Sequence, residues 1–369
     1  MRDYVYINKV RAMLLLLTAV VLVACSDDSE SVEGETSILQ LVPYTRGMEE
    51  NLPSATRAVT LPDGYTEYFG PNSIGVYATT ASEAPDKVRS FSYVNGAWNS
   101  QVSVTNGITY YLYGYMPVNE NIHCAISKLA ESTSYADGAV LTFSNLPPVL
   151  AGDFSVVTGV LQVSSANPTE SVSLTAGNFS YVGKATGSNF VCLMLDHLYS
   201  CVSFNFKVED VYSQLRTIKL TKVELKSETQ LTYPLEVTFK AGENCVVSWS
   251  AAGSFASDYA ELLHAEVGKE LVLPSVSDTD ESHVVVVDGF FAPFNDIAND
   301  LVLRCTYDVY DKEGNKTRGN CVAENKLPAS RIGAGNNKRT TLTLTVNPTY
   351  LYVLSDPDLD NPTITLVKN

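Results

Sequence analysis

Cys201-Val202-Ser203-Phe204-Asn205-Phe206-Lys207-Val208 is the stretch that decides the fold of this chain. Apolar and polar residues alternate strictly along it from Val202. A period of two places the apolar side chains on one face of a β-strand. The same alternation recurs in residues 235–239 and 341–346. Strands with one buried and one solvated face are typical of antiparallel sheets, so we expect an antiparallel β protein.

Turn signals recur at short intervals along the chain. Asn95-Gly96 and Asn106-Gly107 each separate two apolar segments, and Asn-Gly favours the tight type I′ turn of a β-hairpin. We therefore expect two hairpins there, and a third with its tip at residues 311–316. Residues 215–225 read as a strand whose alternation breaks at Thr221-Lys222, which indicates a β-bulge. The run of valines at 284–287 predicts a strand buried on both faces.

No segment shows the periodicity of an amphipathic helix over three turns. Repeated strands with short turns favour an all-β fold of sandwich domains. Residues 166–187 are rich in Ser, Thr, Gly and Asn, and we place a domain boundary near their end. The prediction is an N-terminal sandwich over 58–187, a C-terminal sandwich over 188–346 and a tail over 347–369.

The first residues read as a bacterial lipoprotein signal. Three basic residues precede an apolar run at 13–23, which ends in Leu22-Val23-Ala24-Cys25. The run is too short for a membrane-spanning helix, which needs about 20 apolar residues. We expect residues 1–24 to be removed and Cys25 to carry acyl chains such as palmitate. The alternative is an ordinary secretory signal in which Cys25 is coincidental.

Composition excludes nucleic acid as a partner. The formal net charge is −16. Removing residues 1–24 takes away three basic residues and one acidic residue, so the mature chain carries −18. A chain of this charge repels nucleic acid. Residues 26–37 are acidic and small, and we interpret residues 25–57 as a tether with an N-terminal strand.

Six cysteines remain in the mature chain, and their pairing is left open. An even number in an exported protein permits up to three disulfides. No close Cys-x-x-Cys pair occurs, and several of the six lie in strand-like apolar runs, so buried free thiols are favoured. The six are Cys124, Cys192, Cys201, Cys245, Cys305 and Cys321.

Catalytic motifs are absent from the sequence. None of the four histidines begins a His-Glu-x-x-His motif, and neither a Gly-x-Ser-x-Gly elbow nor a phosphate-binding loop occurs. Residues 356–360 begin like a calcium loop, but Asn361 and Val367 stand where Gly and Glu are needed. His197 is expected to be a hydrogen-bonded structural residue. We predict no enzyme activity, no cofactor and no metal site.

Five motifs together resemble the fimbrillin superfamily, the type V pilus subunits of Bacteroidales. They are spread along nearly the whole mature chain. The motifs are Cys25-Ser26-Asp27-Asp28, residues 110–117 (YYLYGYMP), residues 152–154 (GDF), residues 195–204 (LDHLYSCVSF) and residues 335–344 (GNNKRTTLTL).

The resemblance implies two tandem transthyretin-like, Greek-key β-sandwich domains made as a lipid-anchored precursor at the outer membrane and cell surface. It also implies that a trypsin-like cysteine protease cuts the N-terminal segment after an arginine. Arg57, before Ala58, matches best, and Arg46, before Gly47, is the second choice. The strand at residues 38–42 would then leave, and a strand from another pilus subunit would fill the groove.

The tail supplies the candidate donor strand in this interpretation. Its alternating residues form two sets that could enter pockets of a neighbouring subunit. The first set is Tyr350, Tyr352 and Leu354, and the second is Ile364 and Leu366. Residues 356–360 split the tail, which departs from the pattern of stalk subunits. The position in a fibre (stalk, tip, anchor or accessory) and any host or bacterial surface ligand for adhesion therefore stay open.

A second function fits the same surface lipoprotein. Trp98, Tyr110, Tyr111 and Tyr113 are close in sequence. Aromatic rings stack on sugars, so these four could form a platform that binds glycans at the outer membrane. The same alternation of tyrosines would equally serve a sandwich core.

Overall fold

The computed structural model describes most of the chain from Gly34 onward. The described residues are 34–47, 59–62, 64–100, 102–118, 121–146, 149–150, 154–165, 168, 171–185, 189–227, 230–249, 253–255, 260–291, 301–327, 339–350 and 357–366.

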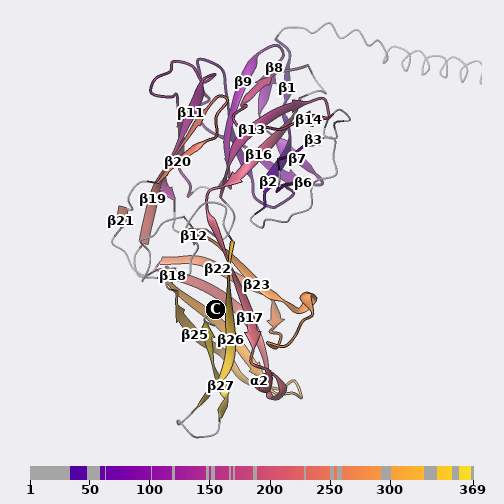
Figure 1. Cartoon of the computed structure of the whole chain (residues 1–369), viewed down its shortest axis with the longest axis vertical. Coiled ribbons are helices and arrows are strands. Elements are labelled where there is room, and N and C mark those ends of the chain that lie inside the picture. Colours follow the sequence, from indigo (N-terminus) through magenta and orange to yellow (C-terminus); the bar gives the residue numbers. More distant parts are fainter. Residues whose placement is uncertain are drawn as a thin grey trace, which may run out of the picture.

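The described strands form two lobes, one above the other (Figure 1). The upper lobe holds two sheets. Sheet A runs in the order β4 (Tyr65–Glu67), β2 (Gln40–Arg46), β16 (Phe190–His197), β13 (Ser155–Val163), β9 (Thr109–Met116), β5 (Ile74–Thr79), β6 (Arg89–Val94) and β7 (Ala97–Ser100), with β15 (Ser180–Val182) also paired to β9. Sheet B runs β10 (Cys124–Ser127), β11 (Gly138–Leu146), β19 (Gln230–Lys240) and β20 (Val246–Trp249), with β21 (Gly253–Phe255) also on β19.

The lower lobe holds two further sheets. Sheet C runs β12 (Val149–Leu150), β23 (Val285–Phe291), β17 (Ser200–Val208), β26 (Arg339–Tyr350) and β27 (Pro357–Leu366). Sheet D runs β22 (Ala260–Val272), β18 (Thr217–Ser227), β24 (Leu301–Tyr310) and β25 (Lys316–Lys326). Short pairs join β1 (Thr36–Ile38) to β8 (Ser103–Thr105) and β3 (Val59–Thr60) to β14 (Val172–Ser173). The described helices are the six-residue α2 (Asp210–Leu215) and the single 3-10 turn η1 (Glu281–His283).

Alternating residues build the core of the lower lobe, as the sequence predicts. Val202, Phe204 and Phe206 of β17 are buried in one apolar cluster with residues of β18 and β24. Leu342 and Leu344 of β26 join this cluster. The cluster therefore lies between sheets C and D, and the expectation of an all-β, sandwich-like fold is confirmed.

Strands from both halves of the chain build the core of the upper lobe. Tyr113 and Phe143 from the first half pack in one cluster with Val237 and Phe239 from the second. Phe143 is opposite Leu235 in the antiparallel pairing of β11 with β19. The upper lobe is therefore completed by residues that follow β17 in the sequence.

The strands are not divided between the lobes at residue 187. β16 lies in sheet A, and the long β18 and β19 take the chain from the lower lobe to the upper one (Figure 1). In return, Val149 and Leu150 of β12 pair with Phe291 and Phe290 of β23 in the lower lobe. The observed grouping differs from the expected boundary because a period of two specifies the buried face of a strand but not its partner.

The hairpin predicted at Asn95-Gly96 is confirmed, and the prediction of a hairpin at Asn106-Gly107 is wrong. Asn95 (φ 54°) and Gly96 (φ 82°) join β6 to β7, and a type I′ turn requires positive φ at both central residues. At Asn106-Gly107 only the glycine has positive φ. The turn is not of type I′, and β8 pairs with β1 near the N-terminus rather than with β9.

Two further strand predictions have opposite outcomes. The bulge in β18 is confirmed, because the pairing with β22 and β24 shifts between Leu220 and Lys222. The prediction that residues 284–287 are buried on both faces is wrong. Val285 is buried, but Val284 and Val286 are 42% and 45% exposed. β23 has the core on one side and solvent on the other, so its alternate valines differ in burial.

All six described cysteines are free thiols. Four are buried, while Cys124 and Cys245 are half-buried. Burial raises the pKa of the Cys305 thiol to about 12 because the thiolate is poorly solvated in the core. Cys305 is therefore a packing residue with little reactive thiolate at neutral pH.

Candidate functional site

The N-terminal strand β2 is the second strand from one edge of sheet A, and the short edge strand β4 covers only its last three residues. It runs parallel to β16, with Leu41 opposite Val191 and Val42 opposite Cys192. On its other side it pairs antiparallel with β4, where Tyr44 is opposite Glu67. The predicted removable strand at residues 38–42 thus falls on the end of β1 and the first half of β2.

Both faces of this strand are buried. Leu39 and Leu41 pack in one apolar cluster, with Leu193 and Phe91. Val42 and Tyr44 pack in another, with residues such as Met194. Leu39 and Tyr44 have no exposed surface. Because successive side chains of a strand point to opposite faces, one segment fills two separate parts of the lobe.

Polar contacts hold both ends of the segment. At the start, Ser37 Oγ donates to the Lys184 carbonyl at 2.9 Å and accepts from Asn189 Nδ2. At the end, His197 Nε2 contacts the Arg46 carbonyl oxygen, and Ser155 Oγ lies 3.3 Å from His197 Nδ1. His197 is buried, as the prediction of a hydrogen-bonded structural histidine requires.

The two candidate cleavage bonds differ in what the structure says of them. Arg46 is the last residue of β2, and its guanidinium lies 6.0 Å from the centre of the Tyr65 ring. The Gly47 N–H donates to the Gly64 carbonyl at 2.7 Å. The carbonyl of Arg46 and the N–H of Gly47, on either side of the candidate scissile bond, therefore both have hydrogen-bond partners. Arg57 and Ala58 lie outside the described residues, as does the lipid site Cys25.

The candidate donor residues lie on sheet C or outside the described part of the chain. Tyr350 ends β26, while Ile364 and Leu366 belong to β27 and are opposite Val346 and Leu344. Ile364 is buried in the core of the lower lobe. Tyr352 and Leu354 lie outside the described residues. Donation to another subunit stays a prediction.

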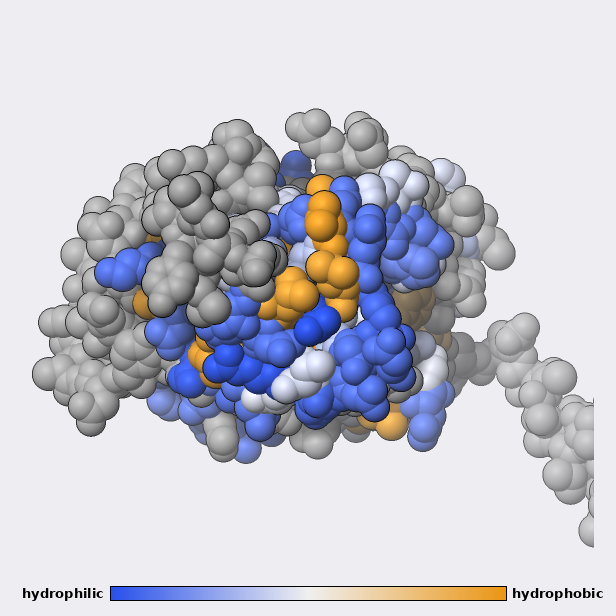
Figure 2. Space-filling model, turned by 90° about the horizontal axis from the view of Figure 1, so that it is seen from below, coloured by the Kyte–Doolittle hydropathy of each residue, from blue (hydrophilic) through white to orange (hydrophobic). Residues whose placement is uncertain are grey.

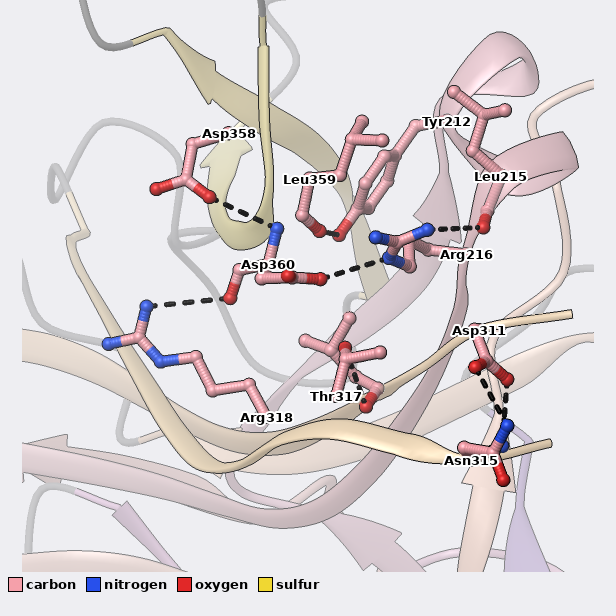
Figure 3. Close-up of polar contacts among 11 residues, drawn as sticks. Tyr212, Leu215, Arg216, Asp311, Asn315, Thr317, Arg318, Asp358, Leu359 and Asp360 are labelled. Carbon is pink, nitrogen blue, oxygen red and sulfur yellow. Dashed lines mark hydrogen bonds and ion pairs between the residues drawn. The ribbon is translucent and has the colours of Figure 1, made fainter. Parts of the chain in front are cut away.

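Side chains of the lower lobe hold the first half of β27, as Figure 3 shows. The Tyr212 hydroxyl donates to the Leu359 carbonyl at 2.7 Å. Arg216 Nε lies 3.0 Å from Asp360 Oδ1, and Arg318 donates to the Asp360 carbonyl at 3.4 Å. In this structure the segment is a strand of its own lobe.

Replacing Ile364 with alanine is expected to lower the free energy of unfolding by about 2–5 kcal/mol, because the lost side chain leaves a cavity in the core. The neighbouring Thr363 is exposed, so Thr363→Ala is expected to change the free energy of unfolding by less than about 0.5 kcal/mol. Urea unfolding of a form that begins at Ser26 measures both. Equal effects of the two changes would contradict the docked position of β27.

The four aromatic residues of the expected glycan platform do not lie together on the surface. Trp98 and Tyr113 are buried in different clusters, with Tyr110 packed beside the first and Tyr111 beside the second. Neighbours on β9 point to opposite faces of the sheet, which separates them. Trp98 instead lies 5.5 Å, between ring centres, from Tyr93, which is 5.6 Å from the half-exposed Phe69.

Two cavities stand out on the described surface. One of about 210 Å³ lies beside β2 and is lined by Phe69, Tyr93 and Trp98 among others. The other, of about 570 Å³, opens beside α2 and is lined by aliphatic residues together with charged and polar side chains, among them Arg216, Asp278 and Lys312. Figure 2 views the molecule from below and shows a small apolar group surrounded by polar side chains on that face.

Metal and membrane chemistry find no support in the described part of the chain. No group of His, Cys, Asp or Glu side chains there could hold a metal ion. None of its helices combines the length and apolar character needed to cross a membrane.

Comparisons with known proteins give structural likeness only. No protein-family model matches the chain, and no curated protein matches it. A fimbrial protein from Bacteroides vulgatus is 11% identical over 89% of this chain and 98% of its own, with a TM-score of 0.38. The fimbrial anchor protein Mfa2 from Porphyromonas gingivalis is 10% identical over 88% of this chain and 95% of its own, with a TM-score of 0.27. At TM-scores below 0.5 these likenesses carry no argument for the function of this chain.

Proposed function

We propose that the chain is a structural or adhesive subunit of a surface fimbrium, made as an outer-membrane lipoprotein and assembled by exchange of its N-terminal strand. The proposal is supported above all by the seat of β2, which lies between β16 and the edge strand β4 and has two buried faces. A strand with these properties can be replaced only by another strand of similar pattern.

Loss of β2 would leave two unfavourable surfaces. The β16 edge would lose its parallel partner, and unpaired backbone groups at a sheet edge recruit other strands. The apolar clusters around Leu41 and Tyr44 would face water. A strand from a second subunit removes both surfaces at once, because it supplies main-chain partners and alternating side chains together.

Cleavage after Arg57 is the step that permits exchange in this proposal. The bonded Arg46–Gly47 peptide is a poor substrate, because a protease needs an extended segment free of other pairing. A cut at Arg57 separates Cys25 and β2 from the rest of the chain. The body of the subunit is then held to the lipid anchor only by the non-covalent pairing of β2.

A limited digest tests this scheme. The form that begins at Ser26 is treated with an arginine-specific protease, and the products are analysed by mass spectrometry and by gels in SDS without heating. The expected result is a single early cut after Arg57, followed by SDS-resistant multimers. Arg57→Ala is expected to abolish both, whereas Arg46→Ala changes neither. A cut chain that stays monomeric would contradict assembly by strand exchange.

Glycan binding is a second candidate function, and one observation favours it. The cavity beside β2 is lined by the ring cluster of Phe69, Tyr93 and Trp98, and aromatic rings of this kind suit the apolar face of a sugar. Quenching of tryptophan fluorescence by oligosaccharides, and its loss in Phe69→Ala, would support it. If oligosaccharides do not change the tryptophan fluorescence of the uncut monomer, the glycan-binding function is contradicted.

A further inference from the structure

The start of the N-terminal strand is held by a buried asparagine that satisfies several groups at once. Asn189 is only 3% exposed. Its Oδ1 accepts from the Lys184 N–H at 2.8 Å and from the Tyr181 hydroxyl. Its Nδ2 donates to the Ser37 hydroxyl and to the Lys184 carbonyl. Its main-chain carbonyl accepts from the Gln40 N–H at 2.8 Å.

The Ser37 hydroxyl has two roles in this network. It accepts a hydrogen bond from Asn189 and donates one to the Lys184 carbonyl. Only a hydroxyl side chain can accept and donate at one atom, so Ser or Thr is needed at this position. An apolar residue there would leave a buried amide donor without its partner, which is unfavourable.

We propose that Asn189 hydrogen-bonds to a hydroxyl on the strand that replaces β2. This contact selects residues 349–354 of a second copy as the donor. This inference rests on the strand exchange proposed above. The seat then requires a strand parallel to β16 with Ser or Thr at the position of Ser37. It also requires apolar residues at the positions of Leu39, Leu41 and Val42.

Residues 349–354 match the buried positions of the seat from Ser37 to Val42, whereas the same register places Asp356 at Tyr44, so the segment refills the seat only as far as Val42. Thr349 aligns with Ser37, Leu351 with Leu39, Val353 with Leu41 and Leu354 with Val42. In its own copy, Thr349 is opposite Asp358 and follows a shift in the pairing of β26 with β27. The four pairs of residues 344–347 precede that shift. Release of residues 349–354 therefore breaks the Thr349–Asp358 and Tyr350–Pro357 pairs but leaves the four pairs of residues 344–347 in place.

The other candidate donor fails the same test. Aligning Ile364 with Leu39 and Leu366 with Leu41 matches the apolar positions. This alignment places Pro362 at the position of Ser37, and proline has no hydroxyl. Shifting by one residue brings in Thr363 but puts Thr365 at the buried position of Leu39. The hydroxyl requirement thus separates two segments that apolar pattern alone cannot distinguish.

Peptide competition on the protease-cut chain tests the inference. Synthetic peptides of residues 347–356 are added before assembly, and bound peptide is measured by native mass spectrometry together with suppression of multimers. The natural peptide and its Thr349→Ser form are expected to bind within about twofold of each other. The Thr349→Val form has nearly the same shape without the hydroxyl, and it is expected to bind about tenfold more weakly.

The outcomes separate this inference from the proposed function. Equal binding of the Thr349→Val peptide would overturn the role of Asn189. Binding of a 361–369 peptide in preference to 347–356 would overturn the choice of donor. If the cut chain forms multimers but the Thr349→Val peptide binds, and suppresses multimers, as well as the natural peptide does, strand exchange stands and the inference fails. If the cut chain neither forms multimers nor binds a peptide, both fail.

Discussion

A chain that begins at Gly47 is expected to lose its folded monomeric state. It lacks Leu39, Leu41, Val42 and Tyr44, all of which are at most 5% exposed. Buried apolar side chains of this size contribute about 1.5–3 kcal/mol each, so their joint loss removes about 6–12 kcal/mol. Most domains have only about 5–15 kcal/mol of stability in total. The remaining protein must therefore unfold, aggregate or find another strand.

Size-exclusion chromatography and circular dichroism distinguish these results. A synthetic peptide of residues 36–46 is expected to restore the monomer, because it supplies the missing partner of β16. Single substitutions provide a matched control: Leu39→Ala is expected to lower the free energy of unfolding by about 2–5 kcal/mol. The neighbouring Ile38 is 49% exposed, and Ile38→Ala should cost much less. A stable monomer without the peptide would show that β2 is dispensable.

A fragment that ends at His197 is expected not to fold, although it contains every strand of sheet A. It lacks Leu235, Val237 and Phe239, which are buried against Phe143 of β11. Without β19 and β20, one face of the upper lobe is exposed to water. Adding the complementary fragment 198–369 is expected to restore folded protein, which circular dichroism of the mixture would detect.

Substitutions in the intact chain test the same interlocking of halves. Phe239→Ala is expected to lower the free energy of unfolding by about 3–5 kcal/mol. Glu236 lies on the same strand but is exposed, so Glu236→Ala is expected to change the free energy of unfolding by less than about 0.5 kcal/mol. The change at Phe239 should affect the unfolding of the upper lobe, followed by the fluorescence of Trp98 in a Trp249→Phe background. Independent folding of the 34–197 fragment would contradict this account.

Local features of the sequence predict local structure well. The alternation from Val202 to Val208 places its apolar residues in the core. The break at Thr221-Lys222 marks the bulge in β18. Asn95-Gly96 forms its hairpin because the backbone there takes positive φ at both residues. Each of these depends on interactions within a few residues, which a single sequence displays directly.

The candidate site was predictable only in part. The apolar residues at 38–42 indicate a strand, and its two buried faces follow from apolar residues at both odd and even positions. The sequence predicts that His197 is a hydrogen-bonded structural residue but not that its partner is Arg46, and nothing in the sequence signals the role of Asn189. Both contact the N-terminal strand from about 150 positions away in the chain, so no local pattern relates them to it.

By itself, the sequence determined that this protein is built of β-strands, where many of them lie, and which face of most of them is apolar. Only the tertiary structure decided the partners: β8 with β1, β19 with β11, and β2 between β16 and β4. The physical reason is that side-chain alternation is a property of one strand, whereas pairing depends on hydrogen bonds and packing between strands far apart in the chain. Many strands carry similar alternation, so the global packing of the lobes selects among partners that look alike locally.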